Sequence, residues 1–134
     1  MPVYLEVTRL FTFDAAHRLE DYVGKCNFLH GHTYKLELTV RGTPDHRGIV
    51  CDFGDLKQIF KAHYEPLLDH KYLNEFLPMV NTTAENLVIW FFDRWEEVVR
   101  PEWPTVEPVR VRIWETPSSF VTLSYADWRA GRAD

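Results

Sequence analysis

Cysteine is scarce in this chain, and its scarcity excludes a small scaffold held together by several disulfides. The 134 residues include only Cys26 and Cys51, so at most one disulfide could form. Long apolar runs are also missing, which excludes a transmembrane helix of about 20 residues. The first residues show no basic start followed by an apolar stretch, which argues against a signal peptide. These absences favour a cytosolic protein whose two thiols are free.

An excess of positive charge is missing as well. The chain has 15 Lys and Arg against 20 Asp and Glu, and its formal net charge is −5. This balance argues against broad electrostatic binding to DNA or RNA, although a local basic pocket could still hold an anionic ligand. Hydrophobic residues make up 46%, which is ordinary for a globular protein. The length predicts a single domain over residues 1–134.

Two segments near the N-terminus alternate between apolar and polar residues. In residues 3–13 the apolar residues Val3, Leu5, Val7, Phe11 and Phe13 stand at odd positions, and the even positions are apolar in residues 34–40 of the segment 32–41. A period of two is typical of half-buried strands, so we expect these segments to pair antiparallel. The residues between them, 18–29, are typical of a loop.

Helical spacing of apolar residues predicts two helices further along the chain. The first covers about 54–67, with Asp52 or Asp55 as its N-terminal cap. The second begins at Thr82-Thr83-Ala84-Glu85, which has the form of a capping box, and is expected to end before Pro101.

Three further segments predict strands, and the last residues predict a surface tail. The strands are a short one over 49–53 and two longer ones over 109–115 and 120–125, and the tail covers 126–134. Strands, then two helices, then strands predict an α+β fold, in which the two helices pack on one face of an antiparallel sheet.

Three histidines stand where the first two strands approach each other. His30 and His32 are two residues apart on an extended segment, so their side chains point to the same, apolar face. Counting the odd positions of the first strand onward reaches His17. An antiparallel hairpin places the end of its first strand beside the start of its second. We therefore expect the three imidazoles to meet at one edge of a buried face.

A metal is the better explanation of such a meeting. A lone histidine on an apolar face is usually a hydrogen-bonded core residue, but three desolvated imidazoles without a metal would leave polar nitrogens poorly satisfied. Three protein nitrogens and an open fourth position are typical of catalytic zinc sites, whereas zinc fingers use paired cysteines. Imidazole also suits other transition metals, and the pattern favours Zn²⁺ among them.

Two other groups offer chemistry near these histidines. Cys26 lies four residues before His30. Beside a metal it would favour the thiolate and could be a fourth ligand, a nucleophile or a general base, or else a loop cysteine without a role. Asp69 and His70 close the first predicted helix. Such a pair can relay protons, although from the residues alone a partner of the helix dipole is the favoured interpretation of His70.

Two carboxylates need separate explanations. Glu115 continues the apolar row of its strand, where an unpaired carboxylate would be costly to bury, so we expect it to form a salt bridge or bind N–H groups of a ligand. Glu85 has a simpler interpretation, because it is the third helical position of the capping box.

Taken together, these segments resemble the 6-pyruvoyl-tetrahydropterin synthase / 6-carboxy-tetrahydropterin synthase family. The matching pieces run in the order of the family and span most of the chain. They are Phe13-Asp14-Ala15-Ala16-His17, Cys26-Asn27-Phe28-Leu29-His30-Gly31-His32, Asp52-Phe53-Gly54-Asp55-Leu56-Lys57, Leu68-Asp69-His70-Lys71-Tyr72-Leu73-Asn74, Thr82-Thr83-Ala84-Glu85-Asn86 and Trp114-Glu115-Thr116. Each piece alone is a modest signal, whereas the ordered set is highly specific.

The resemblance implies a role for each metal-site residue. His17, His30 and His32 would bind zinc. Cys26 would be the catalytic proton acceptor.

It also implies the remaining roles in the active site. Asp69 and His70 would form the relay that serves the cysteine. Glu115 would anchor the pterin ring through its N–H edge, with Thr83 and Glu85 lining the same pocket.

Spacing separates two activities within the family that the chain resembles. Three residues between the cysteine and His-Gly-His are typical of the enzyme of queuosine (7-deazaguanine) synthesis, and pyruvoyl-forming enzymes usually have a longer gap. Here the gap is Asn27-Phe28-Leu29. The resemblance thus implies a zinc-dependent lyase that converts 7,8-dihydroneopterin triphosphate to 6-carboxy-5,6,7,8-tetrahydropterin, with release of acetaldehyde and triphosphate.

The resemblance further implies the tunnelling fold (T-fold), in which subunits join into barrels. The common assembly is a homohexamer made of two trimers, with sites between subunits. The partners would then be a pterin triphosphate and other copies of the chain, with neither nucleic acid nor membrane. Two alternatives remain: a 6-pyruvoyl-tetrahydropterin synthase, which eliminates triphosphate without losing acetaldehyde, and a non-catalytic assembly protein that binds a pterin or a metal.

Overall fold

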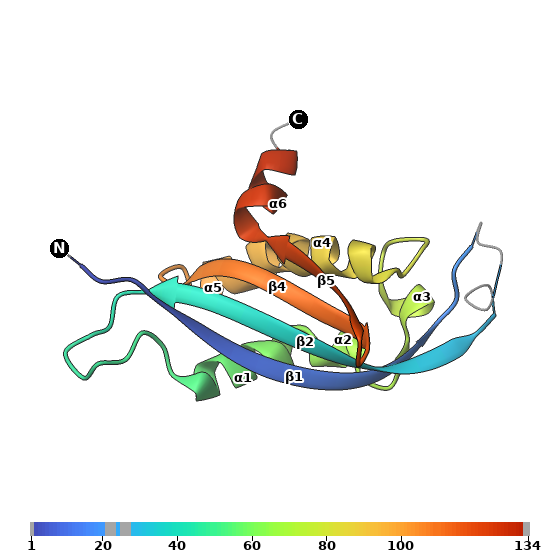
Figure 1. Cartoon of the computed structure of the whole chain (residues 1–134), viewed down its shortest axis with the longest axis horizontal. Helices are drawn as coiled ribbons and strands as arrows, with labels where there is room; N and C mark the ends of the chain where they lie inside the picture. The colour runs from blue at the N-terminus through green and yellow to red at the C-terminus, as the bar shows by residue number, and fades with distance from the viewer. Residues whose placement is uncertain (1, 21–23, 25–27, 133–134) are drawn as a thin grey trace.

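A five-stranded mixed sheet forms the body of the protein in a computed structural model, which describes residues 2–20, 24 and 28–132 (Figure 1). The strand order is β3-β1-β2-β4-β5. The strands are β1 (Leu5–His17), β2 (His30–Gly42), β3 (Lys71–Tyr72), β4 (Glu107–Thr116) and β5 (Ser119–Ser124). All pairs are antiparallel except β1 with β3, which adds a short parallel pair at one edge. The α+β prediction is confirmed.

The long hairpin β1–β2 positions most of the site. Its register runs without a shift from Leu5 opposite Gly42 to His17 opposite His30. The predicted alternation continues past residue 13, so that Phe13, Ala15 and His17 are all buried on one face. Because this face carries the apolar side chains of both strands, it forms one wall of the core.

The helices cover that apolar face of the sheet, and the outer face stays uncovered in Figure 1. They are α1 (Phe53–His63), α2 (Glu65–Leu68), α3 (Leu73–Phe76), α4 (Ala84–Arg94), α5 (Arg100–Glu102) and α6 (Tyr125–Arg132), with a π-helical turn over Trp95–Val99. The largest buried aromatic side chains come from both layers, for example Phe91 and Trp95 from the helical side and Tyr34 from β2. None of the helices among the described residues is both long and apolar enough to cross a membrane.

The first predicted helix, 54–67, is divided in two. α1 ends at His63, and its C-cap Tyr64 has a φ of −120° that departs from helical values; α2 begins at Glu65. Pro66 explains the break, because it has no N–H to donate to the carbonyl of the preceding turn, whereas its place in the first turn of α2 requires no such bond. Asp52 is the cap of α1, since its Oδ1 accepts a hydrogen bond from the Gly54 amide.

The strand predicted over 49–53 is wrong. Phe53 is the first residue of α1, and Asp52 before it is used as the cap. Upstream, the Asp45 side chain accepts hydrogen bonds from the amides of Arg47 and Ile49 and closes a tight turn. The segment between that turn and the cap is too short to pair with a sheet edge.

The second predicted helix begins one residue later than a capping box at Thr82 requires. Thr83 is the cap and accepts a hydrogen bond from the Asn86 amide, so Glu85 occupies the second helical position and the interpretation of Glu85 as its third is wrong. The helix also continues past its expected end. A π-helical turn joins α4 to α5, and α5 includes Pro101. Pro101 cannot donate a hydrogen bond to the carbonyl of the preceding turn, and the π-helical turn accommodates this missing bond.

Residues 126–132 are not a plain surface tail. They belong to α6, which stands away from the sheet in Figure 1, and Trp128 is buried. The Trp128 indole stacks on Tyr125 and donates a hydrogen bond to Asp93. In β4, a register shift opposite Thr39 and Val40 leaves Val109, expected in the buried row, only partly buried.

Candidate active site

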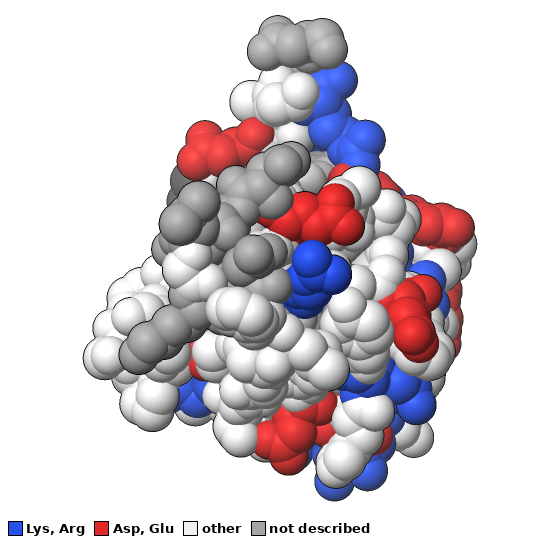
Figure 2. Space-filling view, turned by 90° about the vertical axis from the view of Figure 1, so that its right-hand side faces the viewer, with Lys and Arg blue, Asp and Glu red and all other residues white. Residues whose placement is uncertain are grey.

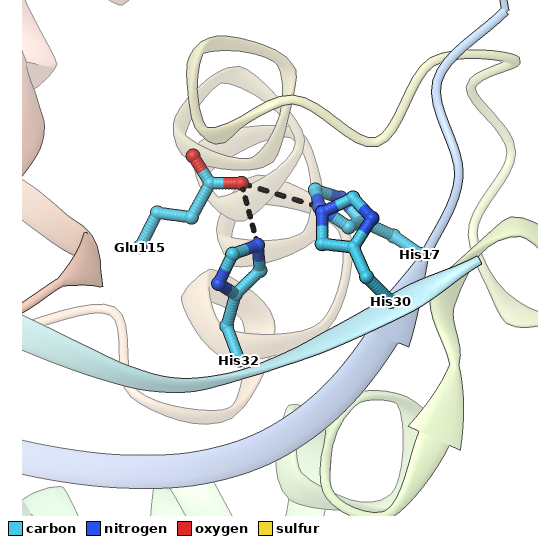
Figure 3. Close-up of side chains that lie close together, drawn as sticks. All are labelled: His17, His30, His32 and Glu115. Carbon is cyan, nitrogen blue, oxygen red and sulfur yellow. Dashed lines mark hydrogen bonds and ion pairs between the residues drawn. The ribbon is translucent and has the colours of Figure 1, made fainter. Parts of the chain in front are cut away.

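Three imidazoles meet where β1 and β2 face each other at one end of the hairpin (Figure 3). His17 lies directly opposite His30 in the register, and their Nε2 atoms are 3.0 Å apart. His32 is the next inward-facing residue on β2, and its ring centroid lies 4.8 Å from that of His30. The strand geometry expected from the sequence is therefore observed, whereas metal binding by these residues stays a prediction.

Main-chain carbonyls set the protonation of two of these rings. His17, which is 0% exposed, has its Nδ1 2.8 Å from the Thr82 carbonyl oxygen. His30 has its Nδ1 2.7 Å from the Phe28 carbonyl oxygen. A carbonyl oxygen only accepts, so Nδ1 carries the proton in each neutral ring and Nε2 presents its lone pair. Two lone pairs thus face each other across 3.0 Å.

Glu115 completes the cluster from β4, the strand next to β2 in the sheet. Its Oε1 lies 3.2 Å from the Nε2 atoms of both His17 and His32 (Figure 3). Glu115 lies two residues after the buried Ile113, so the alternation along β4 points its side chain to the same inner face. A β-bulge falls at this position, because Trp114 pairs with Phe120 and Thr116 with Ser119, which leaves Glu115 as the extra residue of β4.

The electrostatics favour a neutral His32 beside an ionised Glu115. Burial lowers the pKa of His32 and outweighs Glu115, which acts in the opposite direction, while His17 and His30 lower it further. The adjacent His17 imidazole lowers the pKa of Glu115 against the effect of burial, and the other nearby histidines lower it further. These two directions favour a neutral His32 and an ionised Glu115, which are the protonation states that bind a cation.

The cluster fits a transition metal on its own chemistry. One ligand atom from each of His17, His30, His32 and Glu115 lies within 4.8 Å of the others. The His32 Nε2 is buried and has no hydrogen-bond partner among the described residues, although Glu115 is close, and such an orphaned nitrogen is costly without a ligand. Three imidazole nitrogens and a carboxylate oxygen are donors that suit zinc. The carbonyls behind His17 and His30 supply the outer support that metal-binding histidines usually have.

A second cluster lies on the outer face of the same hairpin. The His70 Nδ1 is 3.0 Å from the Asp69 Oδ2, and the Asp14 amide donates to the Asp69 Oδ1 over 3.0 Å. These hydrogen bonds, the one from Asp14 first, lower the pKa of Asp69. His70 follows the C-cap of α2 with a φ of 59°, in the left-handed region where glycine or asparagine is usual. This conformation costs a histidine on the order of 1–3 kcal/mol, which the contacts with β1 must offset.

Asp69 and His70, the predicted relay pair, are therefore in contact with each other. They belong to a cluster separate from that of the three imidazoles. His70 and His32 both line a pocket of about 590 Å³, together with Asp14, Thr33, Lys71 and Tyr72. The His70 side chain is 77% exposed. It is thus free to meet a group from outside the chain.

The other predicted site residues are placed less directly. Thr83 and Glu85 open α4, immediately after the Thr82 carbonyl that holds His17, and Glu85 is exposed. Cys26, the predicted proton acceptor, lies outside the described residues, and so does Lys25. The roles of these residues stay predictions.

Two asparagines that the sequence reasoning did not assign hold the surroundings of the site. Asn74 accepts from the Arg18 amide and donates to the Arg18 carbonyl, and Asn81 does the same for Glu20. They thereby attach the chain after His17 to the segment before α4. Such main-chain clamps carry no periodic signal, and only the position of Asn74 within a matched motif pointed to it.

Surface charge near this end of the molecule is mixed. Among the described residues on the face shown in Figure 2, Lys and Arg are interspersed with Asp and Glu and form no continuous basic patch. An anionic ligand would therefore depend on individual cations rather than on a broad field.

Relatives of the chain share its length and fold. The sequence is 38% identical to the 6-carboxy-5,6,7,8-tetrahydropterin synthase of Synechocystis over 106 residues, which cover 72% of this chain and 79% of the relative. It is 33% identical to the enzyme of that name from Haemophilus influenzae, covering 86% and 95%. It is 35% identical to the 6-pyruvoyl tetrahydrobiopterin synthase of Poecilia reticulata, covering 86% of each chain.

The structural comparison agrees. The 6-pyruvoyl tetrahydropterin synthase of Caenorhabditis elegans superposes with a TM-score of 0.78 at 28% identity, covering 92% of this chain and 96% of that one. The Plasmodium vivax synthase has the same fold, with a TM-score of 0.70 at 20% identity over 90% and 97%. The T-fold expectation is confirmed. The family model for 6-pyruvoyl tetrahydropterin synthase matches residues 6–125, and the chain belongs to that family.

Proposed function

We propose that the chain is a zinc-dependent lyase that converts 7,8-dihydroneopterin triphosphate to 6-carboxy-5,6,7,8-tetrahydropterin, releasing acetaldehyde and triphosphate, in queuosine synthesis. Family membership and relatives named as tetrahydropterin synthases support the reaction class. The observation that carries the proposal is the cluster of three imidazoles, of which His17 is fully buried, beside Glu115.

The choice of product rests on spacing rather than on overall similarity. Relatives of both names match the chain at comparable identity, 38% and 35%. The gap of three residues between Cys26 and His30 supports the 6-carboxy product. The runner-up is the 6-pyruvoyl product, which forms by loss of triphosphate alone.

His17, His30 and His32 would hold the zinc ion. A bound zinc ion supplies Lewis-acid stabilisation of negative charge on substrate oxygens. The chain contributes the dry, fixed setting: the carbonyls of Thr82 and Phe28 hold two rings in the lone-pair-inward form. Glu115 would accept the N–H edge of the pterin ring, and its position beside the imidazoles would bring the ring next to the metal.

Proton movement is assigned to Cys26 and to the Asp69–His70 pair. Cys26 as thiolate would take the carbon-bound proton beside the reacting centre. The His70 Nδ1 is bound to Asp69, so Nε2 would exchange protons with the cysteine or with solvent.

An assembly is part of the proposal, because the two clusters lie on different faces of one hairpin. We assign the active form to a homohexamer of two trimers in which the exposed His70 serves the site of a neighbouring subunit. β1 pairs with β3 only through Ala15 and Ala16, so within the described residues most of its outer edge is available to another chain.

The decisive experiment incubates zinc-loaded protein with dihydroneopterin triphosphate and identifies the products by mass spectrometry. We expect 6-carboxytetrahydropterin together with acetaldehyde. Pyruvoyl product without acetaldehyde would establish the runner-up, and intact substrate would leave a non-catalytic pterin- or metal-binding protein.

Cys26→Ala tests the assigned proton acceptor, and Cys51→Ala is its matched control because Cys51 lies apart from both clusters. We expect Cys26→Ala to abolish turnover and retain zinc. Wild-type rates in that variant would remove Cys26 from the reaction.

A further inference from the structure

Asp14 and Thr33 face each other on the outer side of the hairpin, and the proposed function gives neither a role. They form one rung of the β1–β2 register, and the next rung joins Ala15 to His32. The Thr33 hydroxyl donates to the Asp14 Oδ1 over 2.5 Å. This side-chain bridge is a cross-strand pair on a surface that the helices do not cover.

Asp14 also holds both members of the Asp69–His70 pair through its main chain. Its amide donates to the Asp69 Oδ1 over 3.0 Å. Its carbonyl accepts a 2.6 Å hydrogen bond from the His70 amide, which fastens the left-handed residue to β1. One residue of β1 thus fixes the carboxylate and the backbone of the histidine together.

The Asp14 side chain also lies near the imidazole that Asp69 contacts. A carboxylate oxygen of Asp14, one of Asp69 and a ring nitrogen of His70 all lie within 4.8 Å of one another. Either carboxylate could accept the His70 N–H. The Thr33 hydroxyl occupies the Asp14 carboxylate, and Asp69 is the acceptor that contacts Nδ1 at 3.0 Å.

We propose that Thr33 and Asp14 are positioning residues that hold the His70 ring with Nδ1 on Asp69 and Nε2 available for proton exchange. The catalytic part of this inference rests on the proposed function, in which His70 moves a proton. The geometric part stands without it, because it concerns only which nitrogen of His70 carries the hydrogen.

Thr33→Val tests the catalytic part, since valine keeps the branched shape of threonine and removes the hydroxyl. We expect kcat to fall on the order of tenfold while KM and zinc content stay unchanged, because a misplaced ring slows proton transfer without altering binding. Thr33→Ser should restore the rate. Thr12→Val is the matched control, a threonine on the same face of β1, opposite Lys35 rather than Asp14.

The effect must also disappear when His70 is absent. We expect Thr33→Val to lower the residual rate of a His70→Gln protein no further, since the two changes act through one group. A wild-type kcat in Thr33→Val, an equal loss in Thr12→Val, or a full tenfold loss in the His70→Gln background would each overturn the inference.

A measurement without turnover separates this inference from the proposed function. Nitrogen-15 NMR of the histidine rings reports which nitrogen is protonated. We expect the Nδ1–H form of His70 in the wild type and a mixture of forms in Thr33→Val. If the wild type consumes no substrate, the proposed function fails, and the NMR result alone then decides the positioning: an unchanged His70 spectrum in Thr33→Val contradicts it.

Discussion

The two faces of the β1–β2 hairpin carry two clusters of histidine and carboxylate with opposite surroundings. On the inner face, His17 is fully buried and main-chain carbonyls fix the tautomers of two rings. On the outer face, His70 is mostly exposed and a carboxylate contacts its ring. The difference teaches that the surroundings of an imidazole decide its use. Rings held in one orientation by main-chain carbonyls suit a metal, and an exposed ring beside a carboxylate suits proton exchange.

The largest expected effect removes a ligand from the inner cluster. His32→Ala should abolish both zinc binding and turnover, because a catalytic site with two imidazoles holds the metal weakly. Metal analysis after gel filtration and a rate assay check this outcome. His46→Ala, in an exposed turn, is the matched control and should retain zinc. Full zinc content in His32→Ala would contradict the assignment of the inner cluster to metal binding.

A change in the outer cluster should separate the two properties. His70→Gln is expected to lower kcat by about 10²–10⁴-fold, the range for loss of a general acid or base, with unchanged zinc content. Steady-state kinetics and metal analysis measure both. If this variant loses zinc, the outer face belongs to the metal site and the division of labour is wrong.

Glu115→Gln sharpens the comparison, because this carboxylate has two possible duties in the inner cluster. We expect ring binding to weaken by about tenfold, equivalent to about 1.4 kcal/mol, with the zinc content retained. Calorimetric titration with a pterin measures the affinity. Loss of zinc with unaltered pterin affinity would instead make Glu115 a metal ligand.

Support from α4 gives a smaller effect. Thr83→Ala removes the cap next to the carbonyl that holds His17, and we expect the free energy of unfolding to fall by about 1 kcal/mol. Urea denaturation measures it. Thr83→Ser keeps the hydroxyl and should be close to the wild type; an equal loss in both variants would show that the cap is not responsible.

The smallest effect is a pH dependence of the metal-free protein. Because the folded pKa of His32 is lowered, only the unfolded chain takes up that proton just below the ordinary value of 6.5, so stability falls as the pH drops from 7 toward 5. The lowered pKa of Glu115 adds a further loss below its ordinary 4.5. We expect less than about 1 kcal/mol for the first step, since solvent screens the partly exposed ring. Urea denaturation at pH 7 and pH 5 measures this change in the free energy of unfolding. The His32→Gln protein is the reference, because it lacks the imidazole and should show a smaller change.

The alternation of residues along the two strands was enough to predict that His17 lies beside His30 and His32. A period of two in an unbroken antiparallel hairpin leaves little freedom in which side chains meet. The approach of Glu115 followed only in part. Its place in the buried row was readable, but the bulge at Glu115 depends on the pairing of β4 with β5, which no local pattern specifies. The same holds for the main chain of Asp14, whose hydrogen bonds with Asp69 and His70 join residues more than fifty positions apart.

The misplaced elements lie near two prolines and at the C-terminus. The predicted helix 54–67 ran through Pro66, where the structure divides it into α1 and α2. Pro101 was expected to lie beyond the end of the second helix, but a π-helical turn continues that helix into α5, which includes Pro101. The helix over residues 126–132 is held by contacts of Trp128 with Asp93 and Tyr125. The short polar sequence of this segment did not indicate these contacts.

The unshifted register of the hairpin makes correct folding and competence the same event. Sliding β1 along β2 by one residue would turn His17 to solvent and Asp14 toward the hydrophobic interior, so both clusters would be lost at once. A molecule with a shifted register would not keep one cluster and lose the other. The long β1–β2 pairing therefore couples the two clusters, so that a chain forms both of them or neither.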